Sequence, residues 1–263
     1  MHSPGQGIGR VITATGVTPD IVLLNLRIVY LNYSPARDAD KGTSLKPDQK
    51  EIFNRIAPSW YNFRHHSIFT RELTELARRW KSGRLLNIGC GHGADFLPFK
   101  DAFELHGVDF SPEMLKMAGK YATRYGLTLN LKEAEATALP YPDDYFDRAI
   151  AIATYHHLAT SEDRRKAFTE LKRILRPGGE AFVTVWNHSQ PRFWLKPKDI
   201  MIPWRQRKET LERYYHLFSY WEIEKLAREA GLKILKSFPE SSYRLPVKLW
   251  SRNICLLLQK AAD

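Results

Sequence analysis

Three glycines within five residues, followed sixteen residues later by an aspartate, could hold the adenosyl part of a cofactor. Gly89, Gly91 and Gly93 come directly after the apolar run 85–88, and Asp109 ends a second short apolar stretch. Glycine lets backbone N–H groups approach a ligand closely, and a carboxylate after the next strand can accept two ribose hydroxyls. Taken alone, the run fits a cofactor site and an ordinary tight turn equally well.

The elements around this run alternate between strands and helices. The apolar and periodic patterns predict strands at 84–88, 105–109, 128–133, 146–151, 180–186, 232–239 and 252–259, and helices at 47–63, 68–81, 94–102, 112–125, 162–175 and 220–229. Such alternation indicates parallel βαβ units with right-handed crossovers. We therefore expect an α/β fold with a seven-stranded, mostly parallel sheet and helices on both faces. Ligands of such sheets bind at the carboxyl ends of the strands, where the glycine run and the aspartate would lie.

Two segments lack this regularity. Residues 1–45 show no sustained period and are broken by glycine and proline, so we expect a loosely ordered extension before a domain spanning 46–260. Residues 187–216 are expected to form a long, irregular, basic insertion in that domain.

Composition and charge exclude several classes of protein. A hydrophobic content of 43% is ample for a core, and two cysteines exclude both a disulfide framework and an all-cysteine zinc site within the chain. The longest apolar stretch, 21–31, is too short to span a bilayer and does not resemble a signal peptide, so we expect a cytoplasmic protein without membrane contact. The net charge of +11 favours RNA or DNA as a partner, although a basic proteome or simple solubility also explains it.

A set of motifs in one order resembles the class I S-adenosylmethionine-dependent methyltransferases over roughly residues 47–260. The glycine run, the aspartate with Phe110, the Glu-Ala-Thr-Ala-Leu-Pro stretch at 135–140 and Arg-Pro-Gly-Gly at 176–179 fall in the family's order. This resemblance implies a Rossmann-like fold with S-adenosyl-L-methionine as cofactor, Glu135 accepting from the adenine amino group and the Ala136 N–H meeting a ring nitrogen. The residues it implies at the cofactor are Asn87, Gly89, Gly91, Gly93, Asp109, Phe110, Glu135, Ala136 and Ala151.

Asn87 departs from the family pattern, which usually has an acid just before the glycine run. An asparagine can accept hydrogen bonds from loop amides but offers no charge to the methionyl ammonium of the cofactor. We expect weaker cofactor binding at worst. Direct contact with the cofactor and simple bracing of the loop are equally open for this amide.

Two kinds of base methylation are disfavoured. Methylation at C5 of a pyrimidine generally needs a cysteine that adds at C6, but Cys90 lies in the glycine run and Cys255 in a predicted strand. Exocyclic amino methylation usually uses an Asn/Asp-Pro-Pro-aromatic turn after the fourth strand, where this chain has Ala-Thr-Tyr-His-His-Leu at 153–158.

Other segments resemble the tRNA methyltransferases that esterify 5-carboxymethyluridine at the wobble position. They are 52–58, 63–64, 155–160, 199–204 (with Pro-Trp), 213–218 (Arg-Tyr-Tyr-His-Leu-Phe) and 251–253. The resemblance implies a methyl ester on the side chain of the wobble uridine. It also implies a heterodimer with a small zinc-binding activator protein.

The implied reaction asks little acid–base chemistry of the enzyme. A carboxylate is ionised at neutral pH, so the task is in-line placement and partial desolvation of the nucleophile. Arg64, at an arginine position of the family motif, could grip the carboxylate of the substrate or of the cofactor. We expect His156 to act as a positioning donor, although a histidine here could instead cap the next helix or brace the cofactor. Asn253 is expected to line the wobble base, unless it lies on the strand surface.

The segment 192–213 carries seven basic residues against three acidic ones, interleaved with Phe193, Trp194 and Trp204. This composition suits a phosphate clamp with stacking surfaces for an anticodon loop, and a solvated loop with core-packing tryptophans is the alternative. The expected RNA-binding residues are Arg192, Lys196, Arg205, Arg207 and Arg213. A small-molecule O- or C-methyltransferase and a non-catalytic RNA-binding relative remain as alternative functions.

Overall fold

The computed structural model describes residues 48–207, 209–241 and 247–262, all within one compact unit of the chain. The interpretation of residues 1–45 as a loose extension falls outside the described residues, as does the apolar stretch 21–31.

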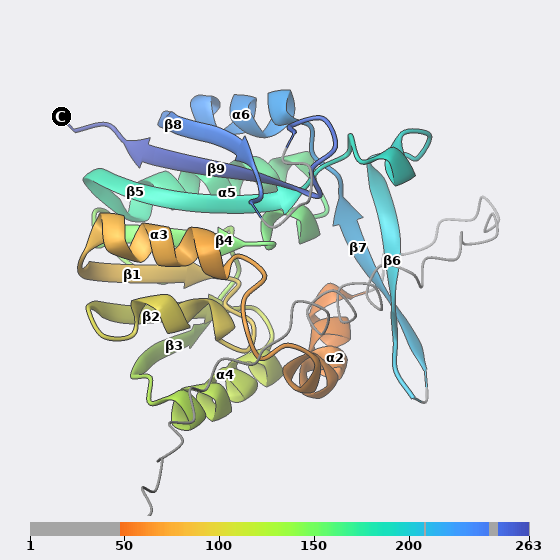
Figure 1. Ribbon diagram of the computed structural model, residues 1–263, viewed down its shortest axis with the longest axis horizontal. Coiled ribbons are helices and arrows are strands. Elements are labelled where there is room, and N and C mark those ends of the chain that lie inside the picture. Colours follow the sequence, from red (N-terminus) through yellow and green to blue (C-terminus); the bar gives the residue numbers. More distant parts are fainter. Residues whose placement is uncertain (1–47, 208, 242–246, 263) are drawn as a thin grey trace, which may run out of the picture. The chain divides into compact units, whose positions relative to one another are not determined.

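Seven strands form the central sheet, in the order β3-β2-β1-β4-β5-β9-β8 (Figure 1). Strands β1 to β5 run parallel to one another, and β9 pairs antiparallel with both β5 and β8. The predicted seven-stranded, mostly parallel α/β fold is therefore confirmed. The strands are β1 (Gly83–Ile88), β2 (Phe103–Asp109), β3 (Leu129–Glu133), β4 (Phe146–Ile152), β5 (Leu175–Trp186), β8 (Leu232–Pro239) and β9 (Asn253–Lys260).

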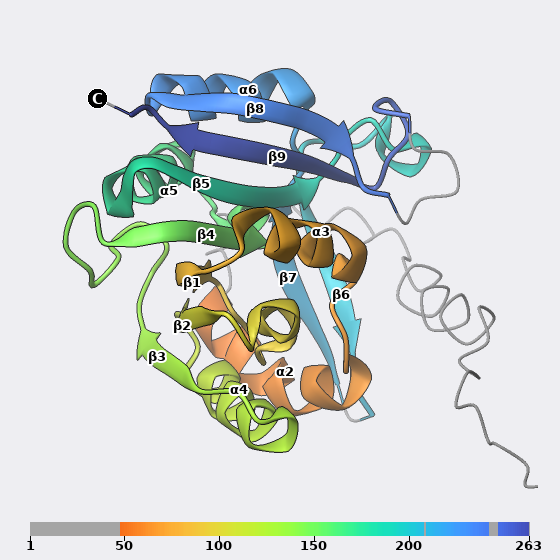
Figure 2. The same cartoon turned by 60° about the vertical axis from the view of Figure 1, so that its left-hand side comes forward.

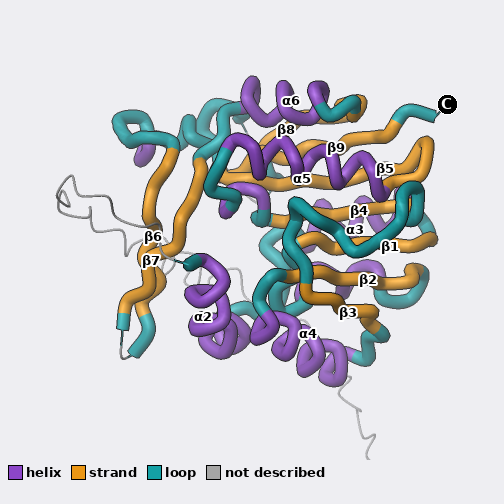
Figure 3. Tube along the Cα trace, turned by 180° about the vertical axis from the view of Figure 1, so that it is seen from behind, coloured by secondary structure: helices purple, strands orange, loops and turns teal. Residues whose placement is uncertain are grey.

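Helices cover both faces of this sheet. The α-helices are α2 (Gln49–Phe63), α3 (Thr70–Trp80), α4 (Pro112–Tyr125), α5 (Ser161–Ile174) and α6 (Tyr220–Glu229), and the 3₁₀ helices are η1 (Ala94–Phe99), η2 (Tyr155–His157) and η3 (Pro191–Phe193). Helices α5 and α6 lie on one face of the sheet, and α3 lies on the other (Figures 1 and 3). Buried side chains of α5 and α6 form one core with the sheet, and those of α3, η1 and α4 form a second. None of the helices in the described ranges is long and apolar enough to cross a membrane.

The helix predicted at 94–102 is a shorter 3₁₀ helix that ends at Phe99. Pro98 lies inside it. Because proline lacks an N–H and clashes with the carbonyl four residues earlier, an α-helix cannot continue through this position without distortion.

Residues 187–216 are not irregular throughout, as the sequence suggested. β6 (Asp199–Arg205) and β7 (Thr210–His216) form a two-stranded antiparallel sheet separate from the main one. Pro203 pairs opposite Glu212 in this ribbon, a position that an edge strand tolerates. Ile200 and Tyr215, which pair across this ribbon, are buried, but the proline and the dense charge obscured the two strands in the sequence.

Helix α2 and the β6–β7 hairpin lie beyond the carboxyl ends of the parallel strands, as Figures 1 and 2 show. The hairpin is fastened to α2 along its length. The Tyr214 N–H donates to Gln49 Oε1 at 3.0 Å, and Trp204 Nε1–H donates to Ser59 Oγ at 2.9 Å. The carboxyl edge of the sheet is therefore covered by a second layer. It is built from α2, which precedes the sheet in sequence, and from the hairpin, which lies between β5 and β8.

Glu180 on β5 anchors α3 to the sheet and offers a test of this packing. Its carboxylate accepts from Arg79 Nε–H (2.9 Å), Arg79 Nη2–H (2.7 Å) and Trp80 Nε1–H (2.8 Å). Burial alone would raise the pKa of Glu180, but these hydrogen bonds outweigh it and the pKa is lowered. A lowered folded-state pKa stabilises the protein above the unfolded value of about 4.3, and this contribution disappears as the pH falls through the folded value.

We expect Glu180→Gln to lower the free energy of unfolding by about 1–3 kcal/mol at pH 7, because charge-assisted hydrogen bonds are lost. The difference from wild type should narrow below about pH 4, where Glu180 itself becomes protonated. Urea unfolding of the variant and the wild type at pH 7 and below about pH 4 measures this difference in the free energy of unfolding. Glu75→Gln, which removes an exposed pair with Arg71 on the same helix, should change stability by less than about 1 kcal/mol. Equal losses in the two variants would contradict the anchoring role.

Candidate active site

The glycine run after β1 forms a loop in which all three glycines have left-handed backbone angles. The φ values are +68° at Gly89, +53° at Gly91 and +92° at Gly93, a region that residues with a Cβ rarely adopt. At Gly89 a Cβ would lie 2.4 Å from Cγ2 of Thr154, so the loop approaches the end of β4 closely. At Gly91 a Cβ would meet nothing within 4 Å, which shows open space beside the loop.

Asp109, at the end of β2, joins this loop to the start of α4. Its buried carboxylate accepts the N–H of Gly91 at 2.8 Å and the N–H of Ser111 at 2.9 Å. Each carboxylate oxygen keeps a lone pair for a further donor such as a ribose hydroxyl. Burial raises the pKa of Asp109 to about 6. Phe110 follows it and packs against Phe53 of α2, with ring centroids 5.3 Å apart.

Asn87 is fully buried one residue before the end of β1. Within the described part of the chain, neither polar atom of its amide has a hydrogen-bond partner. The bracing of loop amides considered for Asn87 is therefore absent. A buried amide without partners is costly and uncommon, and its position two residues before the glycine loop fits a cofactor group as the missing partner.

Of the remaining residues implied at the cofactor, Glu135 and Ala136 lie at the same edge as the loop, and Ala151 lies in the core. Glu135 lies on the surface in the turn after β3, where partial desolvation of its carboxylate raises its pKa, and Ala136 is buried beside it. The Ala134 N–H donates to the Asp109 carbonyl at 3.1 Å, which brings this turn to the same edge. Ala151, in contrast, lies in the hydrophobic core that faces α5 and α6, paired with Val183. Its side chain therefore has a packing role and does not reach the site.

Arg64 directly follows α2 and lies beside the glycine loop. Its guanidinium packs over the ring of Trp60, 4.8 Å from the centroid. Burial, with a smaller contribution from the Arg64 charge, lowers the pKa of His92 in the loop to about 4. Burial raises the pKa of Asp95 to about 6, against the opposing effects of a Ser67 hydrogen bond and of Arg64. The structure thus brings Arg64 to the glycine loop. Whether it binds the carboxylate of the substrate or of the cofactor stays a prediction.

Two residues at this edge were missed by the sequence reading. His92 is buried between the rings of Tyr61 and Tyr121, with centroid distances of 6.1 and 5.5 Å, and its Nε2 has no partner in the described ranges. Asp95 follows at the start of η1. Their signal was present, because both are titratable residues in or next to the glycine run.

His156 and His157 form η2, immediately after β4. The Nδ1 atom of His156 accepts the Trp186 N–H at 3.3 Å, so its proton is on Nε2 and can be donated. The His157 Nδ1–H donates to the Tyr214 carbonyl at 3.0 Å. Burial lowers the pKa of His156 well below its ordinary value and that of His157 to about 3. Thr160, and neither histidine, caps α5, which removes the capping alternative.

Asn253 is the first residue of β9 and pairs with Trp186. It is buried and donates from Nδ2 to the carboxylate of Glu240. The strand-surface alternative is therefore wrong, since the side chain faces inward. Its contact with a wobble base stays a prediction.

The expected RNA clamp is only partly at the surface. Arg192, Arg205 and Arg207 are exposed and Lys196 is partly exposed, at the two ends of β6. The expectation for Arg213 is wrong, because with 3% of its surface exposed it cannot belong to an outer phosphate clamp. The tryptophans are divided in the same way. Trp194 is 56% exposed, whereas Trp204 packs against Trp60 with centroids 5.0 Å apart.

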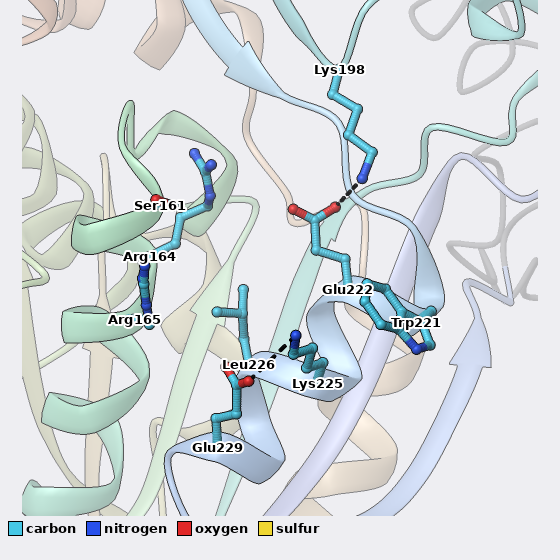
Figure 4. Close-up of a pocket in the computed structure, with 9 residues that line it drawn as sticks. All are labelled: Ser161, Arg164, Arg165, Lys198, Trp221, Glu222, Lys225, Leu226 and Glu229. Carbon is cyan, nitrogen blue, oxygen red and sulfur yellow. Dashed lines mark hydrogen bonds and ion pairs between the residues drawn. The ribbon is translucent and has the colours of Figure 1, made fainter.

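A separate surface pocket of about 250 Å³ lies between the start of α5 and α6 (Figure 4). Its charged side chains largely pair with one another, as in Lys198–Glu222 at 2.7 Å and Lys225–Glu229 at 3.6 Å. It is smaller than typical ligand sites of roughly 300–1,000 Å³ and contains none of the residues implied at the cofactor. The residues implied at the cofactor lie instead around the glycine loop.

Comparison with known proteins agrees with this geometry. A family model described as a methyltransferase domain matches residues 86–183. The chain is 31% identical over 159 residues to a protein of Encephalitozoon cuniculi whose name assigns it to the methyltransferases, covering 57% of this chain and 70% of that one. It is 35% identical over 106 residues to the Arabidopsis thaliana tRNA (carboxymethyluridine(34)-5-O)-methyltransferase, covering 40% of this chain and 24% of that one.

A small-molecule enzyme is also similar. The chain is 33% identical over 141 residues to the demethylmenaquinone methyltransferase of Thermus thermophilus, covering 50% of this chain and 63% of that one. Among solved structures, the CcbJ methyltransferase of Streptomyces caelestis has the same fold, with a TM-score of 0.67 at 17% identity over 82% of this chain and all of that one. From the loop geometry, the sheet order and these similarities, the chain belongs to the class I S-adenosylmethionine-dependent methyltransferases, and its cofactor is S-adenosylmethionine.

Proposed function

We propose that the protein methylates tRNA, forming a methyl ester on the side chain of 5-carboxymethyluridine at the wobble position, in a complex with a small zinc-binding activator protein. The observation that carries this proposal is the β6–β7 hairpin. It covers the carboxyl edge beside the cofactor loop and has exposed basic residues at both ends of β6. The similarity to the Arabidopsis tRNA enzyme supports the choice of substrate.

The hairpin suits a single-stranded loop of RNA. A seven-residue strand spans about 20 Å, enough to follow several nucleotides of backbone. Arg192 and Lys196 precede β6, and Arg205 and Arg207 lie at or just after its other end. Phosphates at these two points would hold a loop along the hairpin, with one base turned toward the site. The exposed Trp194 could stack on a neighbouring base.

The cofactor would be held by the residues of the glycine loop and its neighbours. Backbone N–H groups at Gly89 to Gly93, the carboxylate of Asp109 and the turn at Glu135 would take the adenosyl part, and Asn87 and Arg64 the methionyl part. The cofactor supplies an electrophilic methyl group on a sulfonium. The protein's own residues must then place an acceptor beside it and exclude water.

The histidines are suited to positioning and are poor bases. Burial lowers the pKa of both His156 and His157, so they stay neutral at physiological pH. A carboxylate acceptor needs no deprotonation, because it is already ionised. The Nε2–H of His156 can orient such an acceptor by donating a hydrogen bond. A hydroxyl, amine or carbon acceptor would need a stronger base than these side chains provide.

The Thermus thermophilus relative makes methylation of a small molecule, at oxygen or carbon, the second candidate. The exposed basic residues of the hairpin favour RNA over an uncharged quinone-like ring.

The first experiment follows labelled methyl from S-adenosylmethionine into tRNA lacking the modification, with the zinc-binding partner present. We expect label on the tRNA that mild alkali releases as volatile methanol, because a methyl ester is hydrolysed and a C-, N- or ether-linked methyl is not. Label that resists alkali would overturn the ester. If the cofactor binds but no label reaches RNA, a small-molecule acceptor becomes the better proposal.

Charge reversal at the hairpin tests RNA binding. Arg205→Glu with Arg207→Glu should weaken tRNA binding and reduce the slope of log affinity against log salt by roughly one to two, since each lost phosphate contact lowers it by about 0.7–0.9. Filter binding over a salt series measures both. Arg78→Glu with Lys100→Glu, exposed residues that precede β1 and β2, makes the same change in net charge elsewhere. Equal effects from the two pairs would mean that only net charge matters.

Asn87→Leu separates a ligand contact from a structural role. Leucine has a similar shape but no polar atoms, so the ligand-free protein should be as stable as wild type or up to about 1–3 kcal/mol more stable. Affinity for S-adenosylhomocysteine should fall by about tenfold, since one polar contact is lost. Thermal unfolding and calorimetric titration measure the two quantities. A destabilised variant that keeps its affinity would show that the amide serves only the fold.

A further inference from the structure

Arg213 is a buried cation held among aromatic rings between the hairpin and α2. It lies on β7 opposite Ile202, with 3% of its surface exposed. Its guanidinium carbon is 5.0 Å from the ring centroid of Trp204, 5.3 Å from that of Tyr215 and 5.7 Å from that of Trp60. These rings hold the guanidinium in place, and cation–π attraction offsets only part of its lost hydration.

No acid within the described ranges forms an ion pair with Arg213, and its Nε has no hydrogen-bond partner there. Burial lowers its pKa, and Arg64 acts in the same direction as a nearby like charge. Tyr215, which also forms a hydrogen bond with the Arg213 side chain, and the adjacent Glu212 oppose this shift, but burial outweighs them. A buried charge is normally paired, because an isolated one is among the most unfavourable features of a protein interior. Arg213 therefore lies in a setting that a bound anion would complete.

This cation is next to the groups expected at the acceptor. Tyr215, against which it packs, stacks on His156 with ring centroids 4.7 Å apart and an interplanar angle of 17°. Trp60 is flanked by Arg213 and Arg64, since both guanidinium groups pack against its ring. Arg64 is the one of the two whose charge acts on His92 and Asp95 at the glycine loop.

We propose that Arg213 recognises the carboxylate of the acceptor and so determines its charge specificity, leaving Arg64 to the carboxylate of the cofactor. This inference rests on the proposed function. The acceptor oxygen bonds to the methyl carbon, the methyl–sulfur bond breaks with its electron pair remaining on sulfur, and no proton is released. The product ester is neutral, so it loses its attraction to Arg213 and is bound more weakly than the substrate.

The test compares two synthetic anticodon stem–loops that carry 5-carboxymethyluridine or its neutral amide, 5-carbamoylmethyluridine, at the wobble position. Binding is titrated with S-adenosylhomocysteine present. We expect the wild-type protein to prefer the acid by about tenfold or more, as a hydrogen bond to a charged group supplies. Arg213→Met should abolish this preference, and Arg213→Lys, which keeps a point charge without the planar fork, should retain part of it. Arg165→Met, an exposed arginine of α5, should leave the preference intact.

Stability distinguishes recognition from a structural role. Because no acid within the described ranges forms an ion pair with Arg213, Arg213→Met should melt at the same temperature as wild type or higher, with unchanged affinity for S-adenosylhomocysteine. A lower melting temperature or a failure to fold would overturn the proposal. So would equal wild-type affinity for acid and amide, or an intact preference in Arg213→Met. A clear acid preference without alkali-labile methyl transfer would leave Arg213 as an anion site and remove only the proposed reaction. If neither stem–loop binds, both proposals fail.

Discussion

The buried carboxylate of Asp109 is the contact on which the arrangement of the site depends. It accepts backbone N–H groups from Gly91 and Ser111, and so ties the loop after β1 to the loop after β2. Ser111 then caps α4 and donates its hydroxyl to Asn54 of α2. The layer that covers the site is thus positioned from the same point as the cofactor loop. Burial of this carboxylate is unfavourable, as its raised pKa shows, and the N–H donors offset part of that cost.

The sheet could be predicted from the sequence because its signals are local. Apolar runs, glycine turns and helix caps such as Ser219 before α6 each act within a few residues, and their order determines a parallel sheet. Where two local signals conflicted, the prediction was wrong. Pro98 shortened a periodic helix to a 3₁₀ turn, and Pro203 with the surrounding charge concealed a hairpin.

Within the candidate site, the residues of the cofactor loop could be predicted from the sequence, and the surroundings proposed for the acceptor could not. The spacing of the glycines and Asp109 along the chain is enough to predict a cofactor site. The surroundings of Arg213, in contrast, depend on contacts between β7 and Trp60 of α2, which are far apart in sequence. From the composition of segment 192–213, Arg213 was predicted to be one of several basic residues on the surface. Only the packed structure shows that it is buried while Arg205 is exposed. Asn253 was similarly placed near the correct edge, but its inward orientation follows from pairing with β5.

The basic residues discussed above therefore lie in two different environments, one exposed to water and one buried. In the proposed function, the exposed cations at the ends of the hairpin would act on RNA through water, so their contribution would be salt-dependent and independent of base identity. The buried Arg213 beside Trp60 would act where water is excluded, so its single charge would discriminate strongly between an anion and a neutral group. The neighbouring histidines are kept neutral by burial and cannot readily take a proton from an acceptor. A site with buried positive charge and weak bases is matched to an acceptor that arrives already ionised, and this favours a carboxylate over a hydroxyl or a ring carbon.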